Sequence, residues 1–214
     1  MGICFVDRFS NPSNGAYTAD RWYVVYDGSG ATRTISQQAF TPGTAPVAGY
    51  ESSYFYRYNQ SVAGTGGTFA SIAHRIEDVK TFAGQTVTFS FWAKADAARS
   101  VTMYWSQVFG LGGSSIVDTN FGTVSLTTSW TRYTATATIP SIAGKTIATN
   151  STLQLQFALP YNTTQTIDIW GVQLEAGSSA TPFRTNGATQ QAELAACQRY
   201  YVRFTQPASS YAAY

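Results

Sequence analysis

The sequence predicts an all-β protein, a two-sheet antiparallel β-sandwich with a short C-terminal helix. Three observations carry this prediction: a composition rich in strand and turn residues, alternation of apolar and polar residues, and the absence of helical segments between the alternating ones. The 214 residues include 29 Thr, 21 Ser, 14 Tyr, 13 Phe and 18 Gly. Threonine and aromatic side chains favour pleated surfaces, and glycine favours turns.

Eight segments with strand character follow one another along the chain. They are residues 22–26, 54–58, 68–76, 86–94, 100–106, 131–139, 152–159 and 166–174. The clearest is 86–94, which has Phe89 and Phe91 in one phase and Trp92 and Lys94 in the other. Gly171 indicates a bulge in the last segment. Roughly eight to ten half-buried strands, separated by glycine- and asparagine-containing loops, are typical of a sandwich.

Residues 188–201 break this pattern, because Ala192 and Ala195 recur there at helical spacing among good helix formers. We therefore expect a β-sandwich domain over residues 1–184. A short helix and a C-terminal tail are expected over 185–214. The tail would lead to a further element, in a longer chain or on a neighbouring subunit.

Composition also argues against several classes of protein. Charged residues make up 11% of the chain and the net charge is +2, which gives no reason to expect a nucleic-acid partner. The many aromatic residues argue against disorder, and the lack of a long apolar run argues against membrane insertion. Cys4 and Cys197 lie near opposite ends of the sequence. They fit two buried thiols or one bridge between the ends, but no metal cluster.

The catalytic inventory is thin, and we expect a non-enzymatic protein with no catalytic residues, metal ligands or cofactor. The single histidine, His74, is in phase with Ile72 and Ile76, which favours a structural role. The adjacent carboxylates Glu77 and Asp78 fit a solvated turn better than a glycosidase pair. Structural calcium is common in β-sandwiches, but the acidic residues are too scattered to indicate a site.

A set of aromatic, amide and carboxylate side chains falls out of phase with the predicted core. We take six of them as candidate glycan-binding residues: Trp92, Tyr104, Gln154, Gln156, Asp168 and Trp170. Sugars stack their apolar ring faces on aromatic rings, and their hydroxyls pair with amides and carboxylates. The same side chains would also suit a subunit interface, which is rich in aromatic residues, or they could be covered by the C-terminal helix. The sequence leaves all three roles open.

Three stretches together resemble the carbohydrate-binding-module-like jelly-roll domains of bacteriophage tail fibres and other virion appendages. Residues 14–22 read NGAYTADRW, and residues 87–94 read VTFSFWAK. Near the end, WGVQLEAG at 170–177 is followed by TPF at 181–183 and ELAACQRYY at 193–201. The resemblance covers roughly residues 14–201, which is almost the whole chain.

The resemblance implies a virion structural protein, a homotrimer displayed on the virion surface after assembly in the host cytoplasm. Its partners would be other virion proteins and a host-surface glycan, and its role host attachment or particle assembly. A capsid decoration or head fibre is an alternative to a tail fibre. Two other classes stay open: a glycan-binding module of a polysaccharide-degrading enzyme, and an enzyme acting on glycans. Among the motif residues, Glu175 and Arg184 could pair, and Phe183 could pack beneath the sandwich.

Overall fold

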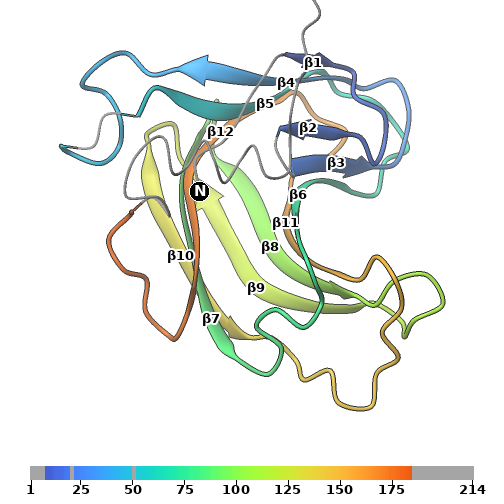
Figure 1. The fold of residues 1–214 in the computed structure, drawn as a ribbon. Helices are drawn as coiled ribbons and strands as arrows, with labels where there is room; N and C mark the ends of the chain where they lie inside the picture. Colours follow the sequence, from blue (N-terminus) through green and yellow to red (C-terminus); the bar gives the residue numbers. More distant parts are fainter. Residues whose placement is uncertain (1–7, 20–21, 50–51, 185–214) are drawn as a thin grey trace, which may run out of the picture.

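The computed structural model describes residues 8–19, 22–49 and 52–184, which form twelve strands in two six-stranded antiparallel sheets (Figure 1). The first sheet contains, in spatial order, β1 (Phe9–Ser10), β4 (Thr32–Ala39), β5 (Tyr54–Val62), β12 (Gln165–Ala176), β7 (Thr86–Ala95) and β10 (Thr131–Thr138). The second contains β2 (Tyr17–Ala19), β3 (Trp22–Tyr26), β6 (Ala70–Ile76), β11 (Thr152–Ala158), β8 (Arg99–Val108) and β9 (Val117–Leu126).

The predicted sandwich is therefore confirmed for the described residues, which contain no helix and so none that could span a membrane. From β5 to β12 the chain passes to the other sheet at almost every step. The one exception is the step from β8 to β9, which are neighbours in the second sheet. This crossing packs the two sheets face to face as a jelly-roll type of sandwich. The predicted helix over 188–201, Cys4 and Cys197 lie outside the described residues, so these expectations stay predictions.

All eight predicted segments became strands, but β1, β2, β4 and β9 were missed. In β4 the core-facing positions Arg33, Ile35 and Gln37 include only one apolar residue, so no alternation was visible. Arg33 is buried nevertheless, because its guanidinium lies 3.9 Å from the ring centre of Tyr26 and its Nε donates to Tyr58 Oη at 3.1 Å. Contacts with Tyr26 and Tyr58 thus allow Arg33 to be buried in a strand whose sequence is mostly polar.

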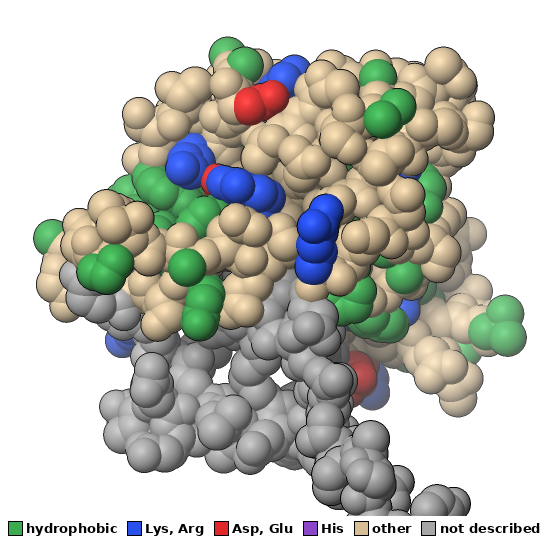
Figure 2. All heavy atoms as spheres, turned by 90° about the horizontal axis from the view of Figure 1, so that it is seen from above, with side chains coloured by type: hydrophobic (Ala, Val, Ile, Leu, Met, Phe, Trp, Pro, Cys, Tyr) green, Lys and Arg blue, Asp and Glu red, His purple; other side chains and the backbone are tan. Residues whose placement is uncertain are grey.

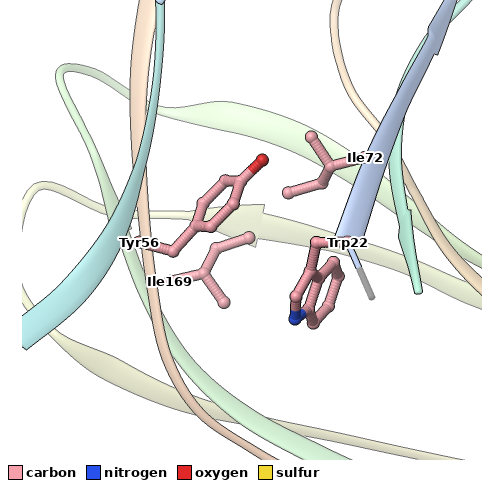
Figure 3. Close-up of a pocket in the computed structure, with 4 residues that line it drawn as sticks. All are labelled: Trp22, Tyr56, Ile72 and Ile169. Carbon is pink, nitrogen blue, oxygen red and sulfur yellow. The ribbon is translucent and has the colours of Figure 1, made fainter. Parts of the chain in front are cut away.

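Aromatic rings fill the space between the sheets. Phe157 of β11 packs against Phe89 and Phe91 of β7, with ring centres 5.4 and 4.9 Å apart. One narrow gap lies between Trp22, Tyr56, Ile72 and Ile169, which come from both sheets (Figure 3). It has no room for a water-sized molecule. The interior is thus closely packed at this point and has no space there for a ligand.

Candidate functional site

The structure divides the six predicted ligand residues between two sheets. Trp92, Asp168 and Trp170 lie on β7 and β12 of the first sheet, whereas Tyr104, Gln154 and Gln156 lie on β8 and β11 of the second. The six candidates therefore do not form one surface. Alternation along a strand tells which side chains point away from the core, but not which sheet the strand joins. Because this chain crosses repeatedly between sheets, the outward residues separate onto opposite faces.

The amides on the second sheet bond to their own neighbours. Gln154 accepts a hydrogen bond from the Tyr23 hydroxyl, and its Nε2 donates to Thr152 at 3.0 Å. Gln156 Nε2 donates to Ser106 Oγ at 2.6 Å, and that hydroxyl donates to Asp118 at 2.5 Å. Side chains held in this way are poorly placed to receive the hydroxyls of a sugar. Of the three predicted residues on this face, Tyr104 is the aromatic one, and it is half-buried.

Six aromatic side chains cluster on the outer face of the first sheet, and we call them the outer aromatic cluster. Its members are Phe40, Phe55, Trp92, Trp130, Trp170 and Phe183. Phe40, Phe55 and Trp170 are buried, whereas Trp92, Trp130 and Phe183 are half-buried. The cluster therefore has a buried base and a partly exposed rim.

Trp170 belongs to the buried base and does not form an exposed plate. Only 5% of its surface is exposed, because its ring centre lies 4.6 Å from that of Phe183 and 6.0 Å from that of Phe40. Its Nε1 donates to Ser52 Oγ at 2.8 Å. Trp170 thus packs within the chain, and the side chains that cover it come from segments outside the strands.

A bulge in β12 shapes this cluster, as the sequence predicted. The pairing of β12 with β7 shifts between Trp170 and Gln173, and Gly171 has a φ of +63°. A Cβ at Gly171 would lie 3.1 Å from Trp92 Cδ1 and 3.4 Å from the Phe183 ring. Glycine therefore supplies both the left-handed backbone and the space that lets these two rings lie against the strand.

A row of charged residues runs across the strands beside the cluster. Arg57 of β5, Asp168 of β12 and Lys94 of β7 are neighbours in the sheet register. Arg57 binds both carboxylate oxygens of Asp168, through Nε at 2.6 Å and Nη2 at 2.8 Å. This bond raises the pKa of Arg57, although burial acts in the opposite direction. Such bidentate pairs fix geometry as well as charge.

Lys94 is held less tightly than Arg57. Its Nζ lies 3.7 Å from Asp168 Oδ2, and 5.3 and 5.9 Å from the ring centres of Trp130 and Phe55. About a third of the side chain is exposed, at 31%. Figure 2 shows such a combination on one face of the molecule, where basic side chains lie beside hydrophobic ones with an acidic group between them. The ammonium thus lies near aromatic rings and faces solvent.

The segment that carries Phe183 is fastened by Glu175. Its carboxylate accepts from Thr181 N at 3.0 Å and from Thr181 Oγ1 at 2.6 Å. The predicted ion pair with Arg184 is confirmed, with Arg184 Nη2 3.8 Å from Glu175 Oε1. Burial raises the pKa of Glu175, but the bonds from Thr181 and Gln173 and the charge of Arg184 outweigh it, so the pKa lies below its ordinary value.

The residues considered for catalysis have structural surroundings. His74 is buried, and its ring centre lies 5.1 Å from that of Trp22, edge to face. Asp78 accepts from Lys80 N at 2.8 Å in a turn. Asp96, which follows β7 and was not a candidate, has its pKa lowered by its hydrogen bonds with Arg99, a shift opposite to the one a general acid needs. Among the described residues, no group of acidic, histidine or cysteine side chains could hold a metal ion.

Three residues important to this face were not among the six candidates: Arg57, Lys94 and Trp130. A signal existed for Lys94, because it shares the outward phase of β7 with Trp92. Arg57 gave no such signal, because its acidic partner is 111 residues away in the sequence. Trp130 comes just before β10 and reaches the cluster only through the fold, with its ring centre 5.2 Å from that of Phe55.

No protein-family model matches the chain, and no curated protein matches it. Solved structures similar in fold include a CBM4 structure, with 21% identity over 74% of this chain and 88% of that one, at a TM-score of 0.47. The family 11 carbohydrate-binding module of a cellulosomal cellulase of Clostridium thermocellum is 13% identical over 82% of this chain and 95% of that one, at a TM-score of 0.47. The enzymatically active domain of bacteriophage CBA120 tailspike protein 4 gives 15% identity over 73% of this chain, at 0.47.

This chain spans 19% of the length of the tailspike domain. All three TM-scores lie below 0.5, so these likenesses carry no argument about function.

Proposed function

We propose that this chain is a non-catalytic glycan-binding module whose binding face is the outer face of the first sheet. The observation that supports this most is the position of the half-buried indoles of Trp92 and Trp130 beside the charged row of Arg57, Asp168 and Lys94. Indole rings offer apolar area to the face of a sugar ring, and the partly exposed side chains of Lys94 and Arg57 can donate hydrogen bonds to its hydroxyls. The two kinds of group lie next to each other.

We further propose that the module serves on the surface of a phage virion, as a trimeric tail fibre or other appendage. The support for this finer role is the sequence resemblance at residues 87–94, 170–177 and 193–201. The same face would also suit a binding module of a polysaccharide-degrading enzyme. Light scattering on a size-exclusion column separates the two roles, since a trimer has three times the 23.2 kDa mass of the chain and a detachable module would be a monomer.

A glycan array followed by binding measurements on variants tests the binding face. We expect Trp92→Ala and Trp130→Ala each to weaken binding by about tenfold or more, because each removes a stacking surface. Tyr104→Ala is the matched control, since it removes a half-buried aromatic ring from the other sheet. Loss of binding in Tyr104→Ala alone would move the site to the second sheet. No binding to any glycan would overturn the proposal.

A further inference from the structure

The outer face of the first sheet carries more positive than negative charge around the indole rings. Arg57 occupies both oxygens of Asp168, so Lys94 keeps only a 3.7 Å contact with that carboxylate. Two cations therefore share one anion. The fork of Arg57 is the better match to the carboxylate, which leaves most of the Lys94 charge unbalanced.

Arg132 adds a further cation beside Trp92, on β10, whereas Asp168 lies on β12 at the opposite edge of β7. Arg132 and Trp92 are register partners on β10 and β7. Arg132 Nη2 donates to Ser90 Oγ at 3.2 Å and to the Thr181 carbonyl at 2.5 Å. Both acceptors are neutral, and no carboxylate of the described residues forms an ion pair with Arg132. Positive charge thus lies near both Trp92 and Trp130.

We infer that the glycan recognised by this face is acidic and carries carboxylates on its sugar rings, as uronic acids do. The inference rests on the proposed function and adds the chemical class of the ligand. The carboxylate of a uronic acid is attached directly to the pyranose ring. A ring stacked on Trp130 or Trp92 can therefore place it beside the ammonium of Lys94 or the guanidinium of Arg132. Charge complementarity of this kind sets specificity and speeds association.

The location of Lys94 favours it as the main contact. Its ammonium lies near apolar rings, where water screens charge less than at an open surface, and 31% of the side chain remains exposed to a ligand. By comparison, Lys80 lies on a loop with 63% of its side chain exposed and pairs at 3.7 Å with Asp78. Lys80→Gln therefore changes the net charge by the same amount without touching the proposed face.

The experiment uses an array of neutral polysaccharides and of alginate, polygalacturonate and hyaluronate, each acidic polymer in its native and carboxyl-reduced form. We expect binding to native acidic polymers, loss of binding on carboxyl reduction, and weakening as salt is raised to about 0.5 M, since added salt screens charge. We expect Lys94→Gln to weaken binding about tenfold, as removal of a charge-assisted hydrogen bond does, and Lys80→Gln to leave it unchanged. Thermal unfolding of each variant confirms that its fold is intact.

Two results would overturn the inference in different ways. Equal binding of neutral or carboxyl-reduced polymers, with no effect of Lys94→Gln, would exclude an acidic ligand while leaving the glycan-binding face in place. Absence of binding to every polymer would overturn the proposed function itself, and the inference with it.

Discussion

Arg57 and Asp168, which are 111 residues apart in the sequence, form a bidentate ion pair on neighbouring strands β5 and β12. The Asp168 side chain is only 4% exposed, while that of Arg57 is 32% exposed. The pair therefore joins two strands at a point where one partner is buried and the other faces solvent. Asp168 is also the middle residue of the charged row beside the outer aromatic cluster.

Removing the cation of this pair should destabilise the fold. We expect Arg57→Gln to lower the free energy of unfolding by about 2 kcal/mol, less than the roughly 3–5 kcal/mol typical of a fully buried pair. The reduction in the expected value reflects the exposure of Arg57 and the presence of Lys94 near the same carboxylate. Urea denaturation measures the change.

The control for this prediction is Lys80→Gln. It removes a cation from a pair exposed on both sides, so its effect should stay within about 0.5 kcal/mol. Equal losses of unfolding free energy in Arg57→Gln and Lys80→Gln would show that the bidentate pair stabilises the fold no more than an exposed ion pair does.

Replacement of Trp170 and replacement of Trp130 should lower the free energy of unfolding by different amounts. Trp170→Ala should cost about 3–5 kcal/mol, because it opens a cavity under Phe183 and Phe40. Trp130→Ala should cost about 2 kcal/mol, because Trp130 is only half-buried. Thermal and urea unfolding of both variants test this order. A stable Trp170→Ala protein that had lost glycan binding would contradict the structural role given to Trp170.

The bulge at Gly171 should not tolerate a side chain. Gly171→Ala should cost at least about 1–2 kcal/mol for the left-handed backbone alone. The new methyl group would also lie 3.1 Å from Trp92 Cδ1, so the indole must shift. We therefore expect weaker glycan binding together with lower stability. Gly84→Ala is a suitable control, because its φ is also positive at +75° but nothing lies within 4 Å of the added Cβ. Equal effects on binding would contradict the steric argument.

Acid should loosen the segment that covers Trp170. The pKa of Glu175 is lower in the folded protein than its ordinary value of 4.5. A lowered pKa means that the carboxylate stabilises the fold above pH 4.5, and that this contribution disappears as the pH falls below that value through the folded pKa. Tryptophan fluorescence should therefore change over this acidic range as Phe183 moves away from Trp170.

In the Glu175→Gln variant, stability at neutral pH should fall and the acid-induced part of the fluorescence change should shrink. An unaltered acid transition in this variant would show that another group controls it. Asp96→Asn serves for comparison, since the pKa of Asp96 is also lowered, by Arg99, but Asp96 begins the turn after β7, away from Trp170.

The strands that the sequence predicted well are those with one apolar face. In β7, Val87, Phe89 and Phe91 alternate with polar residues, and the strand runs within one residue of its predicted bounds. By contrast, β4 has Arg33 and Gln37 at core-facing positions. Local alternation reflects burial on one side, so a strand whose inward positions are polar gives no such signal.

The candidate site was predictable only in part. Outward phase correctly placed Trp92, Asp168 and Trp170 away from the main core. It could not show that Tyr104 and Gln154 lie on the other sheet. Nor could it show that Phe183 covers Trp170, because that contact depends on where a later loop returns.

The sequence by itself determined the all-β class, the positions of eight strands, the bulge at Gly171 and the pairing of Glu175 with Arg184, which lie nine residues apart. Each of these depends on residues near one another in the chain. Only the tertiary structure decided which outward side chains share a face, how Arg57 meets Asp168, and which indoles stay partly exposed. The physical reason is that strand pairing joins distant segments, and alternation along a strand carries no information about its partner.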